Sequence, residues 1–267
     1  MALHLICCSK QVPDPETPAA SFRIDPAAKK VVPAPGVAPV ISPFDEQAVE
    51  VALKIKDARP DTKVTVISMG GASARAVVKH GLAMGADEGV LLDDPAFDGA
   101  DAYQTAYALS QAIRKVGAFD AIFCGRQAAD FDQGQVAIGL AELLGIPALI
   151  NGQSAEFIDD KRVRFERVLP DGIGVFEAPA PVLTSYSQEV GQPRYPTLRN
   201  IMAAARKEIT IWKSGDLSLD PAEFTPKTKL VDLYVPVYEG KCEIIEGENA
   251  ADAGEKLALK LREAKII

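Results

Sequence analysis

The segment from Gly125 to Val136 combines residue types that bind nucleotides in open α/β proteins. It follows the apolar run Ala121–Cys124, which has the composition of a buried strand. A glycine lets a ligand approach the backbone, and a helix starting near Gln133 would point its unpaired N–H groups and positive dipole end at the same place. The segment therefore predicts a phosphate-binding site at the carboxyl end of a strand.

Two carboxylates in this segment need a different role. Asp130 and Asp132 would repel a phosphate placed beside them, so we expect them to accept hydrogen bonds from ribose hydroxyls or to cap the helix. A turn that does nothing more than cap a helix fits the spacing equally well, because such junctions are common in doubly wound sheets. The usual dinucleotide and triphosphate signatures, Gly-x-Gly-x-x-Gly and Gly-x-x-x-x-Gly-Lys-Ser/Thr, are absent from the sequence.

A second motif, Ser42-Pro43-Phe44-Asp45, predicts the start of a helix at Pro43. It offers a serine N-cap, a proline in the first turn and an acidic residue three positions after the cap. Its aromatic ring could also cover an adenine. The helix would turn a core-packing stripe inward (Ala48, Val51, Ala52, Ile55) and solvated charges outward (Glu46, Glu50, Lys54, Lys56).

A third polar segment, Gly191–Pro196, precedes a short helical pattern that starts near Thr197. With Tyr195, Arg194 and an apolar tip at Val190, it has the composition of a contact hot spot on an exposed loop. A plain proline-rich connector is the alternative.

Catalytic and metal-binding arrangements are missing from the sequence. No serine lies in a nucleophile elbow, and neither His4 nor His80 is placed to serve as a base. The cysteines lack metal-ligand spacing, and we expect all four to be reduced, with the adjacent Cys7 and Cys8 on opposite faces of a strand. These features favour a binding protein or carrier over a hydrolase.

The charge balance excludes other classes of function. A net charge of -8 and a pI of about 5.0 leave no broad basic surface for nucleic acid. The longest apolar runs fall far short of the roughly 20 residues that cross a bilayer, and the start lacks a secretory leader. We therefore expect a cytoplasmic protein that is not integral to a membrane.

Continuous apolar runs alternate with helical patterns in the first half of the chain, which predicts an α/β fold with a Rossmann-like parallel sheet covered by helices on both faces. An insertion with a small hairpin (22–32), short antiparallel strands (155–177) and a strand at 182–186 that returns to the sheet are also expected. We predict a nucleotide-binding domain over 1–212, followed by an extended arm over 213–267. The arm is broken by prolines and ends in an amphipathic helix, so it needs a surface to lie on.

Five motifs in the same order closely resemble the β subunit of electron-transfer flavoproteins. The resemblance covers nearly the whole chain. The motifs are Lys10-Gln11-Val12-Pro13-Asp14, Ser42-Pro43-Phe44-Asp45-Glu46, Gly81-Leu82-Ala83-Met84-Gly85-Ala86-Asp87, Gly125-Arg126-Gln127-Ala128 with Asp130 and Asp132, and Pro193-Arg194-Tyr195-Pro196-Thr197-Leu198-Arg199-Asn200-Ile201-Met202.

The resemblance implies a heterodimer in which an α subunit carries the redox-active FAD and the β subunit buries AMP or, in electron-bifurcating members, a second FAD. It implies that the complex relays electrons between an acyl-CoA dehydrogenase, or NADH in the bifurcating case, and a further acceptor such as ferredoxin or a quinone oxidoreductase. Such a subunit is an electron carrier rather than a self-sufficient enzyme. By position, the implied nucleotide-binding residues are Cys8, Ser42, Pro43, Phe44, Asp45, Met69, Gly125, Arg126, Gln127, Ala128, Ala129, Asp130, Phe131, Asp132, Gln133, Gly134, Gln135 and Val136.

The resemblance also implies two partner-binding regions. Glu166 falls where family members place a carboxylate that helps hold the flavin domain of α, and the arm would wrap around α. The partner-recognition loop would comprise Val190, Gly191, Gln192, Pro193, Arg194 and Tyr195, with Val190 as the tip that inserts into the dehydrogenase.

Three departures from the family pattern affect these expectations. The lysine cluster after Asn-Ile-Met is reduced to Ala203-Ala204-Ala205-Arg206-Lys207. One extra residue separates Thr184 from Pro193. The pattern Asp132-Gln133-Gly134-Gln135-Val136 with Ala141-Glu142 is nearer that of the bifurcating or nitrogen-fixation-linked relatives.

Two other classes of function remain alternatives. These are a stand-alone adenine-nucleotide sensor of the universal-stress type, although the glycine-serine phosphate loop of such proteins is absent, and a structural scaffold with a vestigial pocket.

Overall fold

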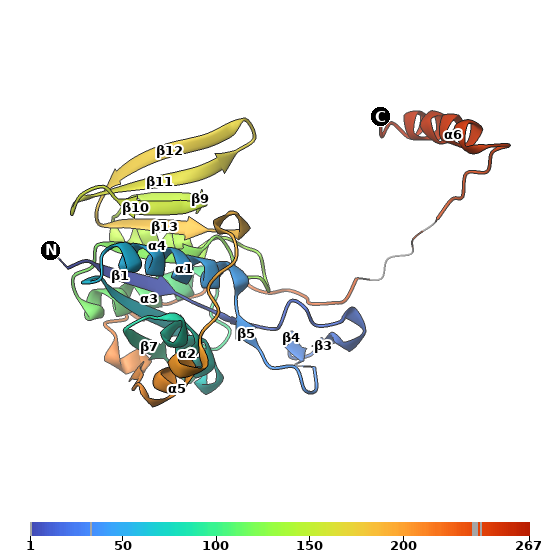
Figure 1. Cartoon of the computed structure of the whole chain (residues 1–267). Helices are drawn as coiled ribbons and strands as arrows, with labels where there is room; N and C mark the ends of the chain where they lie inside the picture. Colours follow the sequence, from blue (N-terminus) through green and yellow to red (C-terminus); the bar gives the residue numbers. More distant parts are fainter. Residues whose placement is uncertain (1, 33, 237–239, 241) are drawn as a thin grey trace. The chain divides into compact units, whose positions relative to one another are not determined.

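The computed structural model describes residues 2–32, 34–236, 240 and 242–267. The chain divides into two compact units, Met1–Leu233 and Tyr234–Ile267, coloured along the sequence in Figure 1. The first unit contains the sheets and five of the α-helices described below. The second unit contains one further α-helix.

A seven-stranded sheet in which all pairs are parallel forms the centre of the first unit (Figure 1). Its order is β14 (Thr210–Trp212), β7 (Glu88–Leu92), β6 (Lys63–Met69), β1 (His4–Cys8), β8 (Ala121–Gly125), β13 (Val182–Tyr186) and β9 (Ala148–Gly152). The chain winds outward from β1 in both directions, so the neighbours β1 and β8 mark the topological switch point of the sheet. This is the place where open α/β sheets bind ligands.

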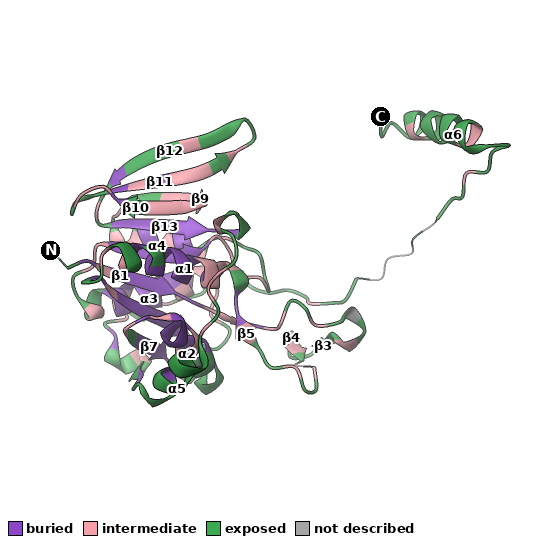
Figure 2. Cartoon of the chain, viewed as in Figure 1, coloured by how far each residue is buried: buried purple, intermediate pink, exposed green. Residues whose placement is uncertain are grey.

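Alternate residues of each central strand pack under helices on opposite faces of the sheet. In β1, Leu5 and Cys7 join the core beneath α1 (Pro43–Ala58), α2 (Arg75–Met84) and α5 (Leu198–Arg206). The intervening Ile6 and Cys8 join the core beneath α3 (Ala102–Val116) and α4 (Val136–Leu144). Figure 2 shows this buried interior running through the sheet and the inner faces of the helices. The predicted α/β fold is confirmed, and Cys7 and Cys8 do face opposite sides.

Small antiparallel sheets complete the first unit. β10 (Ser154–Phe157), β11 (Arg162–Leu169) and β12 (Gly172–Pro179) form a three-stranded sheet, and the pairs β2 (Gln11–Val12) with β5 (Val40–Ile41) and β3 (Arg23–Asp25) with β4 (Lys30–Val32) lie in the N-terminal insertion. Single 3-10 turns occur at Ala19–Ser21 (η1), Ala72–Ala74 (η2), Pro95–Phe97 (η3), Gln188–Val190 (η4) and Ser214–Asp216 (η5). The hairpin expected over 22–32 and the returning strand at 182–186 are therefore present.

Several boundaries differ from the sequence expectation. The helix expected from Gln133 begins at Val136, because Asp132 and Gly134 have left-handed backbones with φ of 52° and 63° that cannot belong to a right-handed helix. Two edge strands, β9 and β14, had no clear periodic signal in the sequence. Each has one neighbouring strand, and most of its residues are exposed or half-buried, so the residue pattern is weaker than in a central strand.

The segment 213–233 belongs to the first unit and packs against the rest of it. Leu217 is buried, the ring of Phe224 lies edge-on to Phe97 with centroids 6.0 Å apart, and the Asp101 carboxylate accepts the backbone N–H groups of Lys227 and Thr228. In the second unit α6 (Ala250–Glu263) has no buried residue. The expected boundary after residue 212 stays a prediction, and the two compact units divide later in the chain, between 233 and 234. Among the described residues, no helix is both long and apolar enough to cross a membrane.

Candidate functional site

Three chain segments meet at the carboxyl ends of β1 and β8 through one buried side chain, Asp45. This residue lies in the first turn of α1, and its two carboxylate oxygens accept the backbone N–H groups of Lys10 at 2.8 Å and of Gly125 at 2.9 Å. Burial raises the pKa of Asp45 to about 7, although the two N–H donors favour the charged form. The carboxyl group thus fixes the start of α1 against the ends of two central strands.

The same contact explains why residue 125 is a glycine. A Cβ at Gly125 would lie 2.4 Å from Oδ1 of Asp45 and 2.8 Å from the carbonyl carbon of Phe44. The space beside this backbone is therefore filled by the protein's own helix α1. Our expectation that the missing Cβ admits a ligand is wrong at this position, since close helix packing accounts for the glycine.

A cleft of about 290 Å³ opens next to this junction, between the loop after β8, the start of α4 and the strands β9 and β13. It is lined by Arg126, Gln127, Gly134, Ala137, Ile138, Ile150, Asn151 and Ser185. The first three were predicted from the sequence. The other five come from α4, β9 and β13, and only the tertiary arrangement brings them to the loop.

The first turn of α4 faces this cleft without a side-chain cap. Gln135 is the N-cap residue and makes no capping hydrogen bond, so the side chain leaves the first N–H groups of a nine-residue helix available. Gly134 and Ala137, on either side of that N-cap, both line the cleft. The predicted phosphate oxygens would bind at this helix start, and this role stays a prediction.

Neither aspartate of the loop caps α4. Asp130 accepts the ammonium group of Lys10 at 2.7 Å and the backbone N–H of Phe131, whereas Asp132 accepts the side-chain amide of Gln127 at 2.7 Å. The Lys10 ammonium also lies 5.3 Å from the centroid of the half-exposed Phe131 ring. The capping alternative for these carboxylates is therefore wrong. Asp130 instead ties the loop to Lys10, two residues after β1, and Asp132 ties the loop to its own Gln127.

The remaining predicted residues lie at the ends of central strands, at the start of α1 or in the loop after β8. Cys8 and Met69 lie at the ends of β1 and β6 on the α3 and α4 side of the sheet, and the guanidinium of Arg126 lies 5.3 Å from the Phe44 ring. Ser42 precedes α1 as expected, but its hydroxyl makes no capping bond. Ala128, Ala129 and Gln133 lie in the loop between β8 and α4.

Three serine hydroxyl groups at this edge are buried without a hydrogen-bond partner. They belong to Ser9, directly after β1, to Ser42, directly before α1, and to Ser68, near the end of β6. Buried polar groups usually have a hydrogen-bond partner. Buried hydroxyl groups without one, at the ends of the strands, therefore indicate a place where a polar ligand or water binds. No local motif in the sequence marks Ser9 or Ser68 as part of this edge.

The buried thiols of Cys7 and Cys124 are poor nucleophiles. Hydrogen bonding to Cys8 and burial raise the pKa of Cys124, and burial raises that of Cys7. All four cysteines are unpaired, as expected. Among the described residues, no group of three or more His, Cys, Asp or Glu side chains is placed to hold a metal ion.

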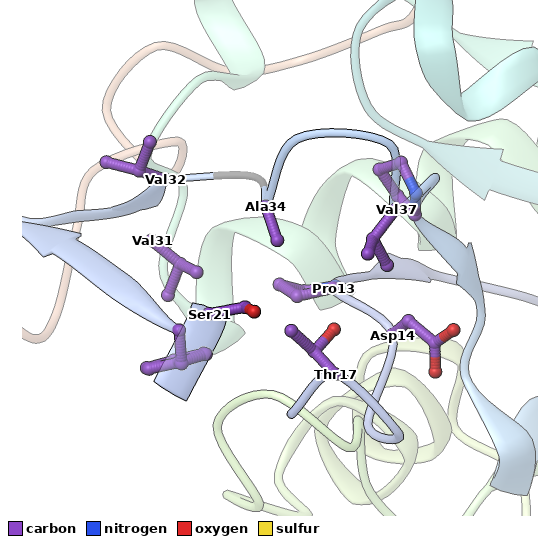
Figure 3. A pocket seen from close by; sticks show the side chains of 10 residues that line it. Pro13, Asp14, Thr17, Ser21, Val31, Val32, Ala34 and Val37 are labelled. Atoms are coloured by element: carbon purple, nitrogen blue, oxygen red, sulfur yellow. The ribbon is translucent and has the colours of Figure 1, made fainter. Parts of the chain in front are cut away.

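A second, much smaller cavity lies inside the N-terminal insertion (Figure 3). Its volume is about 40 Å³, enough for about one water molecule, and its walls are mostly apolar, with Pro13, Val31 and Val37 among them. It is too small for a nucleotide.

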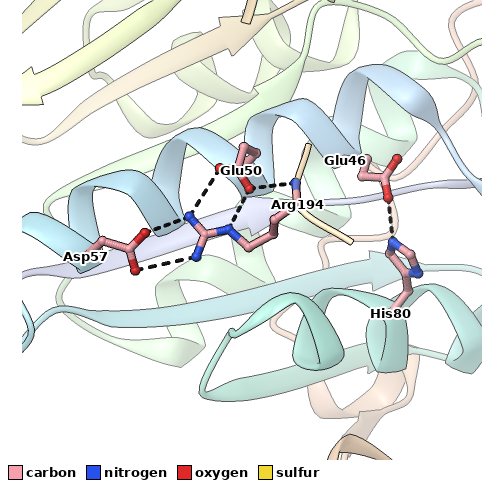
Figure 4. Close-up of polar contacts among 5 residues, drawn as sticks. All are labelled: Glu46, Glu50, Asp57, His80 and Arg194. Atoms are coloured by element: carbon pink, nitrogen blue, oxygen red, sulfur yellow. Dashed lines mark hydrogen bonds and ion pairs between the residues drawn. The ribbon is translucent and has the colours of Figure 1, made fainter. Parts of the chain in front are cut away.

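The predicted recognition loop is anchored to α1 by Arg194 (Figure 4). Its guanidinium binds the Glu50 carboxylate through Nε at 2.7 Å and Nη2 at 3.1 Å, and it reaches Asp57 through Nη2 at 2.7 Å. These carboxylates raise the pKa of Arg194. Glu50 is buried, which corrects our expectation that this outward charge is solvated.

The apolar surface of this loop is not where the sequence placed it. Val190, the expected tip, is half-buried and packs on the core beneath α1. Tyr195 is 82% exposed instead, and the next helix adds exposed Leu198, Ile201 and Met202. An exposed apolar patch of this kind marks a contact surface.

Glu166 lies in β11 on the side of the three-stranded sheet opposite the buried Phe165. Its carboxylate accepts the hydroxyl of Ser154 at 3.0 Å and the side-chain amide of Gln153 at 3.2 Å. Two neighbouring cross-strand pairs of β11 and β12 lie on this side of the sheet. They are Glu166 with Val175 and Val168 with Ile173. The three aliphatic side chains are exposed, so this face also presents apolar surface beside a carboxylate.

Known proteins similar to this chain agree with one another. A family model described as an electron transfer flavoprotein domain matches residues 31–217. The chain is 40% identical to the electron transfer flavoprotein subunit beta of Thermoanaerobacterium thermosaccharolyticum, over 99% of this chain and 100% of the relative. It is 35% identical to the caffeyl-CoA reductase-Etf complex subunit CarD of Acetobacterium woodii, over 99% and 100%, and 34% identical to the protein FixA of Azorhizobium caulinodans, over 82% and 78%.

Proposed function

The chain belongs to the electron transfer flavoprotein family as a β subunit, and we propose that it works in a heterodimer whose α subunit carries the redox-active FAD. Its role is electron transfer, and the complex would pass electrons between a dehydrogenase and a further acceptor. The observation that supports a nucleotide in β is the cleft between the loop after β8 and the uncapped start of α4. The cytoplasmic location expected from the sequence stays a prediction.

The residues around the cleft fit a mononucleotide. Ligand pockets span roughly 300–1,000 Å³, and the cleft of about 290 Å³ lies just below the lower limit of that range, which favours a small nucleotide. Arg126 and the first N–H groups of α4 would hold the phosphate, and Asn151 and Ser185 would offer polar groups to the rest of the ligand. We therefore propose AMP as the nucleotide of this subunit, with FAD as the alternative.

The identity of the nucleotide decides the mechanism. Bound FAD would supply a second redox centre and make bifurcation from NADH possible, whereas AMP supports folding and assembly. The relative CarD is by name a subunit of a caffeyl-CoA reductase-Etf complex. In both cases, the residues of this chain bind and orient the nucleotide.

The partners are proposed from the exposed apolar surfaces. The face with Glu166, Val175 and Ile173 has the composition of a subunit interface and would contact α, as would the exposed Leu257 and Leu259 of α6. The loop 190–195 would bind an acyl-CoA dehydrogenase, together with the exposed side of α5. Ferredoxin or a quinone oxidoreductase would be the further acceptor.

Nucleotide counting in the purified heterodimer tests this proposal. The protein is denatured, and FAD and AMP are quantified by absorbance and mass spectrometry. We expect one FAD and one AMP per heterodimer. Two FAD molecules and no AMP would establish the bifurcating architecture, whereas one FAD with no other adenine nucleotide would contradict the assignment of the cleft in β.

A further inference from the structure

We propose that Arg194 is a positioning residue that holds the loop 187–197 on α1, so that Tyr195 and Leu198 form a preformed contact surface. This inference rests on the docking role proposed above for the loop. It adds a specific device, an ion-pair clamp between Arg194 and the acidic residues Glu50 and Asp57, that maintains the shape of the loop before a partner arrives.

The clamp has the geometry of a strong interaction. Arg194 binds Glu50 with two guanidinium nitrogens at 2.7 and 3.1 Å, and the backbone N–H of Arg194 donates to the same carboxylate at 3.1 Å. The side chain of Glu50 is only 6% exposed. A buried carboxylate needs its partner, because an unpaired buried charge is costly, so the loop is tied to α1 at this point.

The rest of the segment has few other backbone anchors. Within residues 192–196, all of which the structure describes, Pro193 and Pro196 have no N–H to donate, and the only backbone N–H with a hydrogen bond is that of Arg194. One further side-chain hydrogen bond lies within this segment. The side-chain amide of Gln192 donates to the Tyr195 hydroxyl at 3.2 Å. Without the clamp, this segment would lose its main connection to α1.

The clamp holds the middle of a connection whose two ends are already fixed on the first unit. Val190 packs on the core on one side, and α5 begins at Leu198 on the other, so Arg194 fixes the middle of the connection. Tyr195 follows Arg194 directly and points its ring to solvent. A preformed surface avoids the free-energy cost of ordering loop side chains when the partner binds.

Two substitutions break the clamp from opposite sides. Arg194→Gln removes the guanidinium from the loop, and Glu50→Gln changes α1 without altering the loop. Arg59→Gln is the matched control, because the Arg59 side chain is 33% exposed against 32% for Arg194, is also ion-paired and also lies near α1, but binds Asp160 and Phe157 instead of the loop. The double variant Arg194→Gln/Glu50→Gln avoids leaving a buried charge unpaired if a single variant unfolds.

Each variant is prepared as the αβ heterodimer and measured in two ways. Amide hydrogen exchange of a peptide covering 188–197 reports loop order without any partner. The rate of electron transfer from an acyl-CoA dehydrogenase, as KM and kcat for the heterodimer, reports docking. We expect at least tenfold faster exchange of the hydrogen-bonded amides of this peptide, those of Val190, Gly191 and Arg194, in both clamp variants. We also expect a roughly tenfold higher KM and an unchanged kcat, with Arg59→Gln like the wild type.

The two measurements separate failure of the clamp from failure of the docking proposal. Unchanged exchange in both clamp variants would overturn the inference. Faster exchange without a change in KM would also overturn it, provided that Tyr195→Ala raises KM. If Tyr195→Ala leaves KM unchanged as well, the docking role of the loop itself is wrong.

Discussion

The carboxylate of Asp45 accepts the backbone N–H of Gly125 at 2.9 Å, and a Cβ on Gly125 would lie 2.4 Å from that same carboxylate oxygen. A glycine and an acidic residue that are 80 positions apart in the sequence therefore require one another. Together they join the start of α1 to the end of β8, directly beside the proposed nucleotide cleft. This junction gives the first two predictions.

Replacing Gly125 with alanine should destabilise the protein. The new methyl group would overlap both Asp45 and the backbone of Phe44, and such overpacking costs about 1–3 kcal/mol. Urea unfolding of the heterodimer measures the change in free energy. The control is Gly215→Ala, where a Cβ meets no atom within 4 Å, and its effect should stay within about 0.5 kcal/mol. Equal stability of the two variants would show that α1 does not pack as described.

Asp45 should make stability depend on pH between about 4 and 7. Its pKa is about 7 in the folded protein, whereas an exposed aspartate in the unfolded chain has a pKa of 3.8, so the unfolded chain releases this proton first. The contribution of Asp45 to the free energy of unfolding is therefore largest below about pH 4. It declines as the pH rises to about 7, by an amount on the order of 4 kcal/mol. In Asp45→Asn this decline should disappear.

The measurement is urea unfolding of the heterodimer at a series of pH values and constant protein concentration. The stability advantage of the wild type over Asp45→Asn should shrink as the pH rises. The exposed Asp61→Asn serves as a control that should retain the wild-type dependence. Parallel curves for the wild type and Asp45→Asn would mean that Asp45 does not titrate in this range.

Arg126 should contribute to nucleotide affinity. It lines the cleft and stacks near Phe44, so its guanidinium is available to a phosphate group. Loss of one charge-assisted hydrogen bond, of about 1.5–3 kcal/mol, should weaken AMP binding roughly 10- to 100-fold in Arg126→Gln. Equilibrium dialysis of the nucleotide-stripped heterodimer measures the dissociation constant. Arg114→Gln, which changes an exposed arginine bonded to the Leu143 carbonyl, should bind AMP normally, and the prediction fails if both variants do.

Removing the second unit should weaken heterodimer formation and leave the first unit folded. Within 234–267, no described residue is buried, and α6 exposes Leu257 and Leu259. A variant that ends at Leu233 and is produced together with α should show a higher dissociation constant by analytical ultracentrifugation. Its far-ultraviolet spectrum should retain the α/β signature. Unchanged affinity for α would contradict the proposed role of the arm.

Much of the fold could be predicted from the sequence because the central elements have strong local patterns. The apolar strands β1, β6 and β8 and the periodic helix α3, whose bounds Ala102–Val116 match the prediction, carry enough information in their own residues. Pro43 fixed the start of α1 in the same way. The order of five weak motifs identified the family.

Only the tertiary structure decided what those residues do at the site. The sequence could not show that Gly125 is required by Asp45, that Glu50 is buried under Arg194, or that Asn151 and Ser185 complete the cleft. Each of these facts joins residues far apart in the chain, and local propensity does not encode such contacts. The sequence determined which elements form and which family they belong to, whereas the packing of α1 on β8 and on the loop determined the environment of each functional side chain.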